Sequence, residues 1–335
     1  MPELLRERVG RSWREARVAG AAIASVGMAV PEHAVPNRVI AERLGVDDTW
    51  IETRTGIRSR RIAGPGQRLY ALASEAASNA LSGARVDPAE LDLVLVATMS
   101  HDHLTPSASA LVAAEIGADR AGALDLNAAC SGFVAALGTA AAQIESRRAD
   151  AVLVVGADLL SHHTDPDDRS TAGLFGDGAG AVVMRAVDPP GRVGPVVLGA
   201  DGANSELVRA GRDEGLIRMN GPDTFRHAVD RLSEATLDAL DAAGRGIDAI
   251  DLFVYHQANS RIIGAVGERL GLPSERVIDC MADYGNTSAA SVPIALAEAQ
   301  AQGALVDDAT VLLSAFGGGL TWAATVIEWG LADAA

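Results

Sequence analysis

The chain has 335 residues, of which 48% are hydrophobic, so it can bury a substantial core in one large domain or in two halves. Its formal net charge of −16 argues against general nucleic-acid binding, which needs a clustered positive surface. No apolar run of about 18 residues is present to span a membrane, and only two cysteines occur, so we expect a cytoplasmic protein without disulfide bonds.

The N-terminal part of the chain combines an extension, a strand and a basic stretch. Residues 1–18 are rich in Arg and Glu without a sustained apolar face, so we interpret them as an N-terminal extension, with a partner-docking arm as the alternative. An apolar strand is predicted at 21–30. Trp50 then lies among several Arg residues in 48–61. This stretch is either a solvated charged segment or a platform for a phosphorylated, aromatic ligand.

Strands and helices alternate from residue 69 onward, which predicts a doubly wound α/β fold. Strands are expected at 92–98, 123–128, 151–156 and 178–184, and helices at 69–81, 107–116 and 131–145. All four strands are predicted to be buried. Cys130 lies where a strand passes into a helix, and the positive end of the helix dipole there predicts a lowered thiol pKa and a reactive thiolate. The alternative is an ordinary core cysteine.

A second half of the chain repeats the first. The segments 86–96, 150–155 and 175–180 are echoed by 246–254, 308–313 and 316–321, respectively. A turn cluster at 188–191 marks the expected boundary. We therefore predict an extension at 1–18, a first half at 19–190 that carries the cysteine, and a second half at 191–335.

Two predicted strands of the second half lead into polar residues. His256 follows an apolar strand at 252–255, and Asn286 follows an apolar stretch that contains Cys280. In doubly wound sheets, ligands bind beyond the carboxyl ends of strands. Each residue alone is more often structural, but together with Cys130 they form a coherent site. We interpret Cys280 as a core thiol in a strand.

Six stretches of the sequence, in this order, resemble the β-ketoacyl-acyl-carrier-protein synthase III family, condensing enzymes of the thiolase fold. They are the segments 50–56, 127–133, 175–181, 256–259, 284–289 and 316–322. The resemblance implies two duplicated βαβ halves packed as five α-β-α-β-α layers, and a homodimer. It also implies a decarboxylative Claisen condensation that initiates fatty-acid or polyketide synthesis. Cys130 would take an acyl group from acyl-CoA, and malonyl-acyl carrier protein would lose CO₂ and attack the thioester.

The same resemblance assigns roles to individual residues. Cys130 would be the nucleophile, and His256 and Asn286 would be uncharged donors to the enolate. The backbone N–H groups of Cys130 and Gly318 would form the oxyanion hole. The other implied contacts are Trp50 and Arg169 on the two faces of the CoA adenine, Arg54 at the nucleotide end, Asn259 on the pantetheine arm, Arg261 in carrier-protein docking and Thr105 at the acyl pocket. Thr105 replaces a bulky Phe of short-chain members, which predicts a longer or branched primer.

Other functions are weighed against condensation. An acyltransferase that moves the acyl group to a hydroxyl or amine is the main alternative, although it would not need Asn286. A non-catalytic partner subunit would not need the complete Cys, His and Asn set. A metal site at His162 and His163 is disfavoured because adjacent His side chains point apart. The glycine spacing at 176–180 does not fit a dinucleotide fingerprint, so we expect no metal and no cofactor, with acyl-CoA as a substrate.

Overall fold

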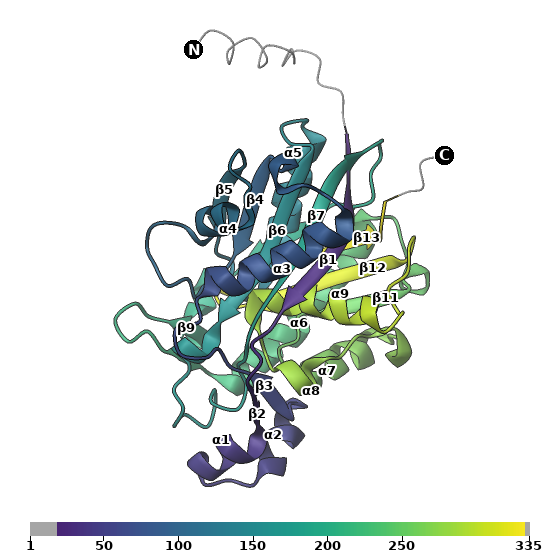
Figure 1. Cartoon of the computed structure of the whole chain (residues 1–335). Helices are drawn as coiled ribbons and strands as arrows, with labels where there is room; N and C mark the ends of the chain where they lie inside the picture. The colour runs from purple at the N-terminus through teal and green to yellow at the C-terminus, as the bar shows by residue number, and fades with distance from the viewer. Residues whose placement is uncertain (1–18, 332–335) are drawn as a thin grey trace.

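The computed structural model describes residues 19–331, in which two β-sheets are stacked with helices between and outside them (Figure 1). The extension predicted at 1–18 lies outside the described residues. The first sheet has five strands, and β7 runs antiparallel to both of its neighbours while β4, β5 and β6 are parallel. Across this sheet the order is β1 (Gly20–Ala29), β7 (Asp177–Val187), β6 (Ala151–Leu159), β4 (Leu93–Ala97) and β5 (Gly122–Leu126).

The second sheet has four strands and pairs β11 with β12 in parallel, while the other neighbours are antiparallel. Its order is β11 (Leu252–Tyr255), β12 (Thr310–Gly317), β13 (Thr321–Glu328) and β8 (Val197–Ala200). Two small hairpin-like sheets complete the strands. They pair β2 (Ala34–Pro36) with β3 (Ser59–Arg61) and β9 (Val208–Ala210) with β10 (Ile217–Met219).

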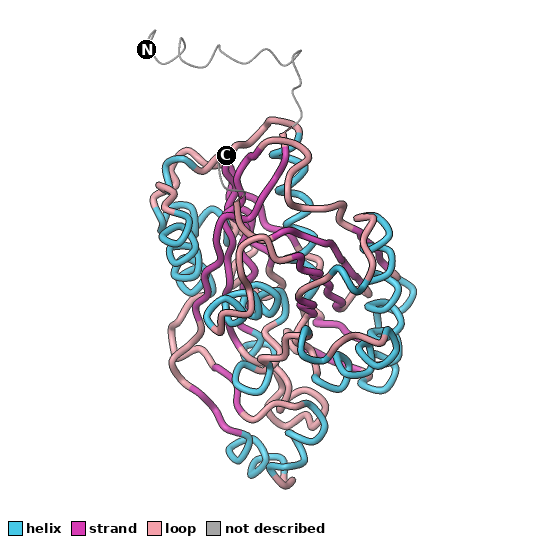
Figure 2. The backbone as a smooth tube through the Cα atoms, turned by 90° about the vertical axis from the view of Figure 1, so that its right-hand side faces the viewer, coloured by secondary structure: helices cyan, strands magenta, loops and turns pink. Residues whose placement is uncertain are grey.

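The helices form three layers around the two sheets, which gives the expected α-β-α-β-α order. The central layer holds α5 (Gly132–Glu145) and α9 (Ser291–Ala301); the outer layers hold α3 (Leu69–Ala84) with α4 (Ala108–Ile116), and α6 (Gly221–Ala242) with α7 (Ser260–Leu270). The remaining helices are α1 (Asn37–Leu44), α2 (Asp48–Thr55) and α8 (Met281–Tyr284). Figure 1 shows α1 and α2 projecting at one end, and Figure 2 shows the strands enclosed by helices. Within residues 19–331, no helix is both long and apolar enough to cross a membrane.

The central helices are buried because they are apolar on nearly every side. In α9, Val292, Ile294 and Leu296 are at most 1% exposed, and in α5 Phe133 and Leu137 are fully buried. A helix that is hydrophobic all round is stable only when it is enclosed. These two helices therefore form the layer against which both sheets pack, and the end of α5 that begins beside Cys130 lies in the interior.

The internal repeat expected from the sequence extends to matching hydrogen bonds. Asp92, just before β4, accepts a hydrogen bond at Oδ2 from the N–H of Asp150 at 2.6 Å. Asp251, just before β11, accepts one at Oδ2 from the N–H of Thr310 at 2.8 Å. In each half, an aspartate just before one strand therefore accepts a hydrogen bond from a backbone N–H at the start of the neighbouring strand. The division at residues 190 and 191 remains a prediction.

Two expectations of buried strands are wrong. β5 is an edge strand with a neighbour on one side only, and Leu124 within it is 55% exposed. The apolar stretch around Cys280 forms no strand; Val277 makes a single bridge to Phe253, and Cys280 is a half-buried residue at the start of α8. The apolar sequence predicted a buried strand in both places. Burial and strand pairing depend instead on which segments pack beside each stretch in the fold.

Candidate active site

One cavity of ≈ 660 Å³ lies between the two halves and collects nearly all of the predicted site residues. Nine residues predicted from the sequence line it: Cys130, His256, Asn286, Gly318, Trp50, Arg54, Arg169, Asn259 and Arg261. Thr105 does not line it and lies on an exposed loop. The cavity thus brings together segments that are distant in the sequence, while the roles of these residues and of Thr105 stay predictions.

Cys130 is presented by a tight turn, η2 (Ala129–Ser131), that leads directly into α5. Ala129 has a φ of 46°, a left-handed conformation that is strained for a residue with a Cβ. The turn is held from the second half, because Thr321 Oγ1 donates to the Ala128 carbonyl oxygen at 2.9 Å. A Cβ at Gly317 would lie 2.6 Å from the Cys130 nitrogen, so only glycine permits this approach.

The predicted lowering of the Cys130 pKa is wrong. Cys130 is reached through the cavity but is otherwise enclosed, and this burial raises the pKa of its thiol to about 11. The N–H groups of Cys130 and Gly318 act in the opposite direction because both donate toward the sulfur. Loss of hydration outweighs these donors. The structure nevertheless places the two N–H groups of the expected oxyanion hole together at the nucleophile.

His256 directly follows β11 and is 3% exposed. Its Nδ1 lies 2.6 Å from Ser291 Oγ, an oxygen that already accepts a hydrogen bond from the N–H of Gln257. His256 Nδ1 and Ser291 Oγ thus share a hydrogen bond, in which the Ser291 hydroxyl donates when the ring proton is on Nε2. Burial lowers the pKa of His256 to about 3, so the imidazole is uncharged at neutral pH. Serine 291 was not predicted from the sequence.

Asn286 is 4% exposed and is held at both its backbone and its side chain. Its N–H donates to the Leu174 carbonyl oxygen at 3.0 Å, and its own carbonyl oxygen accepts from the N–H of Gly176 at 3.0 Å. The side-chain oxygen accepts from the N–H of Ser288 at 2.9 Å. Since that oxygen is occupied, the amide NH₂ is the donor left for a bound ligand.

The outer part of the cavity carries the aromatic and basic residues expected for a nucleotide. The Arg54 guanidinium lies over the Trp50 ring, 4.4 Å from its centroid, within α2. Arg169 donates from Nη2 to the Leu44 carbonyl oxygen at 3.0 Å. The expected sandwich of an adenine between Trp50 and Arg169 stays a prediction, because in this structure it is Arg54 that stacks on Trp50.

Asn259 and Arg261 lie at the start of α7, beside α2. Asn259 caps this helix by accepting from the N–H of Arg261 at 2.9 Å and donates from Nδ2 to the Arg54 carbonyl oxygen at 3.0 Å. Arg261 is exposed, with its guanidinium 5.9 Å from the centroid of the Phe225 ring. The two helices that line the outer cavity are thereby joined.

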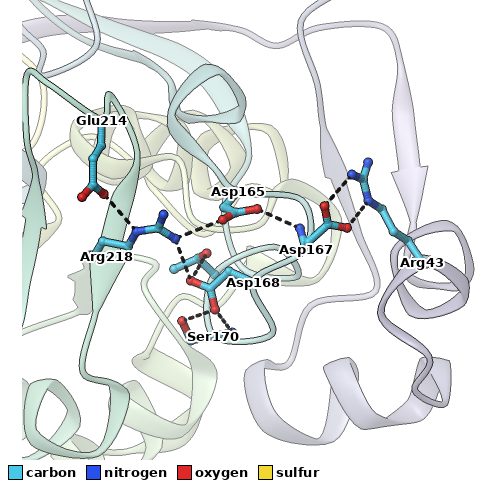
Figure 3. A network of polar contacts seen from close by, with 8 residues as sticks. Arg43, Asp165, Asp167, Asp168, Ser170, Glu214 and Arg218 are labelled. Atoms are coloured by element: carbon cyan, nitrogen blue, oxygen red, sulfur yellow. Dashed lines mark hydrogen bonds and ion pairs between the residues drawn. The ribbon is translucent and has the colours of Figure 1, made fainter.

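An ion-pair network holds the loop that carries Arg169 (Figure 3). Arg43 contacts both carboxylate oxygens of Asp167 at 2.7 and 2.9 Å. Arg218, from β10, contacts Asp165 at 3.0 Å and Asp168 at 4.0 Å. The acidic residues near His162 and His163 thus pair with arginines and fasten one wall of the cavity to α1 and β10.

A buried carboxylate behind the nucleophile was missed by the sequence analysis. Asp158, the residue before the last one of strand β6, has no exposed surface, and its charge raises the pKa of Cys130. A signal for it was present, because a charged residue near the end of an otherwise apolar buried strand needs partners. Its Oδ1 accepts hydrogen bonds from Ser100 Oγ at 2.7 Å and from the N–H of Met99 at 3.0 Å.

These features define a class of protein: an acyltransferase with the thiolase fold that uses a cysteine. Residues 124–202 match the family described as 3-oxoacyl-[acyl-carrier-protein (ACP)] synthase III, and 240–329 match its C-terminal domain. A β-ketoacyl-[acyl-carrier-protein] synthase III of Roseiflexus castenholzii is 45% identical over 325 residues, covering 92% of this chain and 98% of that protein. One of Streptomyces coelicolor is 44% identical, covering 94% and 96%.

Solved structures agree with this assignment. The 3-oxoacyl-[acyl-carrier-protein] synthase III of Aquifex aeolicus superimposes with a TM-score of 0.90 at 41% identity, covering 92% of this chain and all of that one. The priming β-ketosynthase of the R1128 polyketide pathway gives a TM-score of 0.91 at 39% identity, covering 96% and 99%. The chain belongs to the β-ketoacyl-[acyl-carrier-protein] synthase III family and is a condensing acyltransferase.

Proposed function

We propose that this enzyme condenses an acyl-CoA primer with malonyl-acyl carrier protein through an acyl-Cys130 intermediate, and so initiates fatty-acid or polyketide synthesis. The observation that supports this most is the meeting of Cys130, His256 and Asn286 in one cavity, with a nucleophile from the first half and uncharged donors from the second. Covalent transfer to sulfur divides a difficult condensation into two easier steps.

In the first step, the Cys130 sulfur attacks the acyl carbon and the CoA sulfur leaves. Negative charge develops on the acyl oxygen, and the N–H groups of Cys130 and Gly318 are placed to stabilise it. The close approach of Gly317 to Cys130 supports this pairing, because it brings the glycine turn against the nucleophile.

In the second step, loss of CO₂ leaves an enolate on the malonyl thioester oxygen. A neutral His256 donates from Nε2, and Asn286 donates from its NH₂ group. Burial supports both roles, because it keeps the imidazole uncharged at neutral pH, with a pKa of about 3. Hydrogen bonds to a developing charge in a site sheltered from water are worth more than in solution. The carbanion then attacks the Cys130 thioester.

The outer cavity suits the proposed substrates. Trp50, Arg54 and Arg169 offer a ring and guanidinium groups for the CoA nucleotide, and Asn259, which lines the same cavity, would bond the pantetheine arm. Exposed Arg261 at the entrance supports docking of an acidic carrier protein. Because the chain carries a net charge of −16, such docking needs a local positive patch.

We also propose a cytoplasmic homodimer. The edge strand β5 has unpaired backbone groups on one side and exposes Leu124, while Leu104 on the nearby loop is 85% exposed. A second copy that covers this edge would bring Thr105 to its partner's acyl pocket, in keeping with the resemblance. Two cysteines without a disulfide bond fit a reducing compartment.

The test is to supply the purified enzyme with acyl-CoA and malonyl-acyl carrier protein and to measure CO₂ and β-ketoacyl product. Equal amounts of both are expected. Transfer of the acyl group to a hydroxyl or amine acceptor without CO₂ release would contradict the proposal and favour the acyltransferase alternative. The buried, fully held Asn286 weighs against that alternative, since such transfer needs no enolate donor.

A further inference from the structure

The imidazole of His256 is held from behind by Ser291, the first residue of the central helix α9. Ser291 is 1% exposed, and within residues 19–331 its Oγ has two hydrogen-bond partners: His256 Nδ1 at 2.6 Å and the N–H of Gln257 at 3.3 Å. His256 lines the substrate cavity, whereas Ser291 does not. Because Nδ1 is occupied by a residue outside the cavity lining, Nε2 is the ring nitrogen available to a ligand.

A count of donors and acceptors decides which atom donates in the bond between Ser291 and His256. The Ser291 hydroxyl carries one proton, and a buried hydroxyl proton needs an acceptor. The N–H of Gln257 can only donate, so of the two partners only Nδ1 can accept that proton. If Nδ1 carried the ring proton, both partners would be donors and the hydroxyl proton would be unsatisfied. The count therefore favours a ring proton on Nε2.

The N–H of Gln257 that completes this count belongs to a residue that is itself firmly held. Gln257 is 2% exposed, and its side-chain NH₂ donates to the carbonyl oxygens of Tyr255 at 2.8 Å and Ile278 at 3.1 Å. Its Oε1 accepts from the N–H of Cys280 at 3.0 Å. Gln257 does not line the cavity. These bonds instead fix the backbone donor that occupies one lone pair of the Ser291 oxygen.

We propose that Ser291 is a positioning residue that holds His256 as the tautomer protonated at Nε2, and so keeps a donor available to the malonyl thioester oxygen during condensation. This inference rests on the condensation proposed above. In the other tautomer, Nε2 would present a lone pair to the enolate and would oppose its negative charge. The tautomer matters because burial keeps the imidazole neutral, with a pKa of about 3, so only one ring nitrogen carries a proton.

Ser291 is expected to act on one of the two steps only. In acyl transfer, the charge on the acyl oxygen is stabilised by the N–H groups of Cys130 and Gly318, and His256 is not needed as a donor. Loss of Ser291 should therefore spare acylation and slow condensation. A general disturbance of α9 would impair both steps, because α9 packs against α5, which begins beside Cys130.

The first experiment locates the ring proton by ¹⁵N NMR of the enzyme labelled at histidine. Protonated and unprotonated ring nitrogens have well separated shifts, and couplings to the ring C–H protons tell Nδ1 from Nε2. The signals of His256 are those missing from His256→Gln. The wild type should show a protonated Nε2, and Ser291→Ala should move part of the proton population to Nδ1. A wild-type proton on Nδ1 would overturn the proposal without any variant of Ser291.

The second experiment measures single-turnover acylation and CO₂ release from malonyl-acyl carrier protein. Ser291→Ala should acylate like the wild type and condense about tenfold more slowly. The side-chain NH₂ of glutamine is a donor whatever Ser291 does, so adding Ser291→Ala to His256→Gln should slow condensation no further. Ser314→Ala is the matched control, because it removes a fully buried hydroxyl of β12 that has no hydrogen-bond partner among the described residues. It should behave like the wild type.

The outcomes separate a role through His256 from a role in the fold. Wild-type condensation in a folded Ser291→Ala would overturn the proposal. An equal loss from Ser291→Ala in the wild type and in His256→Gln would do the same, because Ser291 would then act without His256. Slow condensation with the proton still on Nε2 in Ser291→Ala would also contradict it. Failure of the proposed function looks different, because the wild type itself would then form no β-ketoacyl product while the NMR measurement still reports the tautomer.

Discussion

The two sides of the active site respond to the same burial in opposite ways. On the first-half side, enclosure raises the pKa of the Cys130 thiol to about 11, which opposes the thiolate needed for attack. On the second-half side, enclosure lowers the pKa of His256 to about 3, which maintains the neutral donor that an enolate needs. Loss of water favours the uncharged form of any group. The thiolate of Cys130 therefore needs groups that stabilise its charge, and the N–H groups of Cys130 and Gly318 act in that direction.

The largest expected effect removes the nucleophile side completely. Cys130→Ala should abolish the mass increase that acyl-CoA produces on the enzyme, because no other group supplies the attacking sulfur. Cys280→Ala is the matched control and should retain it, since Cys280 lies at the start of α8 and does not line the cavity. Acyl-enzyme formation in Cys130→Ala would show that Cys130 is not the nucleophile of this site.

The next effect is confined to the donor side. Asn286→Ala should still form the acyl-enzyme but should slow condensation by about 10²-fold or more, because it removes one donor to the enolate. Single-turnover measurements of acylation and of CO₂ release separate the two steps. If the variant loses both steps equally, the division of labour between the two sides is incorrect.

A smaller effect concerns the acyl primer, which Cys130 takes up on the nucleophile side. Because Thr105 is small, the wild type should accept C4 to C12 acyl-CoAs about tenfold better than acetyl-CoA, and Thr105→Phe should reduce that preference. The measurement is the rate of priming with each acyl-CoA at fixed malonyl-acyl carrier protein. Strict preference for acetyl-CoA in the wild type would contradict the assignment of Thr105.

The smallest effect is on stability, and its sign follows from the depressed His256 pKa. An unfolded His protonates near pH 6.5, whereas folded His256 does so only near pH 3. Between these values the unfolded state binds the extra proton, so acidification lowers the free energy of unfolding by at most about 1.4 kcal/mol per pH unit. This loss is absent above pH 6.5 and fully developed below pH 3.

The measurement compares urea unfolding at pH 7 and pH 5 for the wild type and His256→Gln, which removes the titrating group. The variant should lose less stability on acidification than the wild type. Exposed His33→Gln serves as the control and should follow the wild type. An identical pH dependence in all three proteins would mean that burial does not depress the pKa of His256, and the contrast between the two sides would disappear.

The sequence by itself determined the alternation of elements and predicted the chemical groups of the site. Apolar runs and the repeat predicted most strands and helices within a few residues, since hydrophobic periodicity is a local property. The motifs around Cys130, His256 and Asn286 identified the three chemical groups, which the structure brings into one cavity. Exposure of β5 was not predictable in this way, because an edge strand and a central strand can have the same pattern.

Only the tertiary structure decided how each group behaves. The Cys130 thiol pKa was expected to fall because a helix begins beside it, but enclosure by the second half raises it. The hydrogen bonds of Ser291 and Asp158 join residues that are distant in the chain. Hydration and hydrogen-bond partners are set by what surrounds a side chain in three dimensions, and neither the neighbouring residues nor the helix dipole specify them.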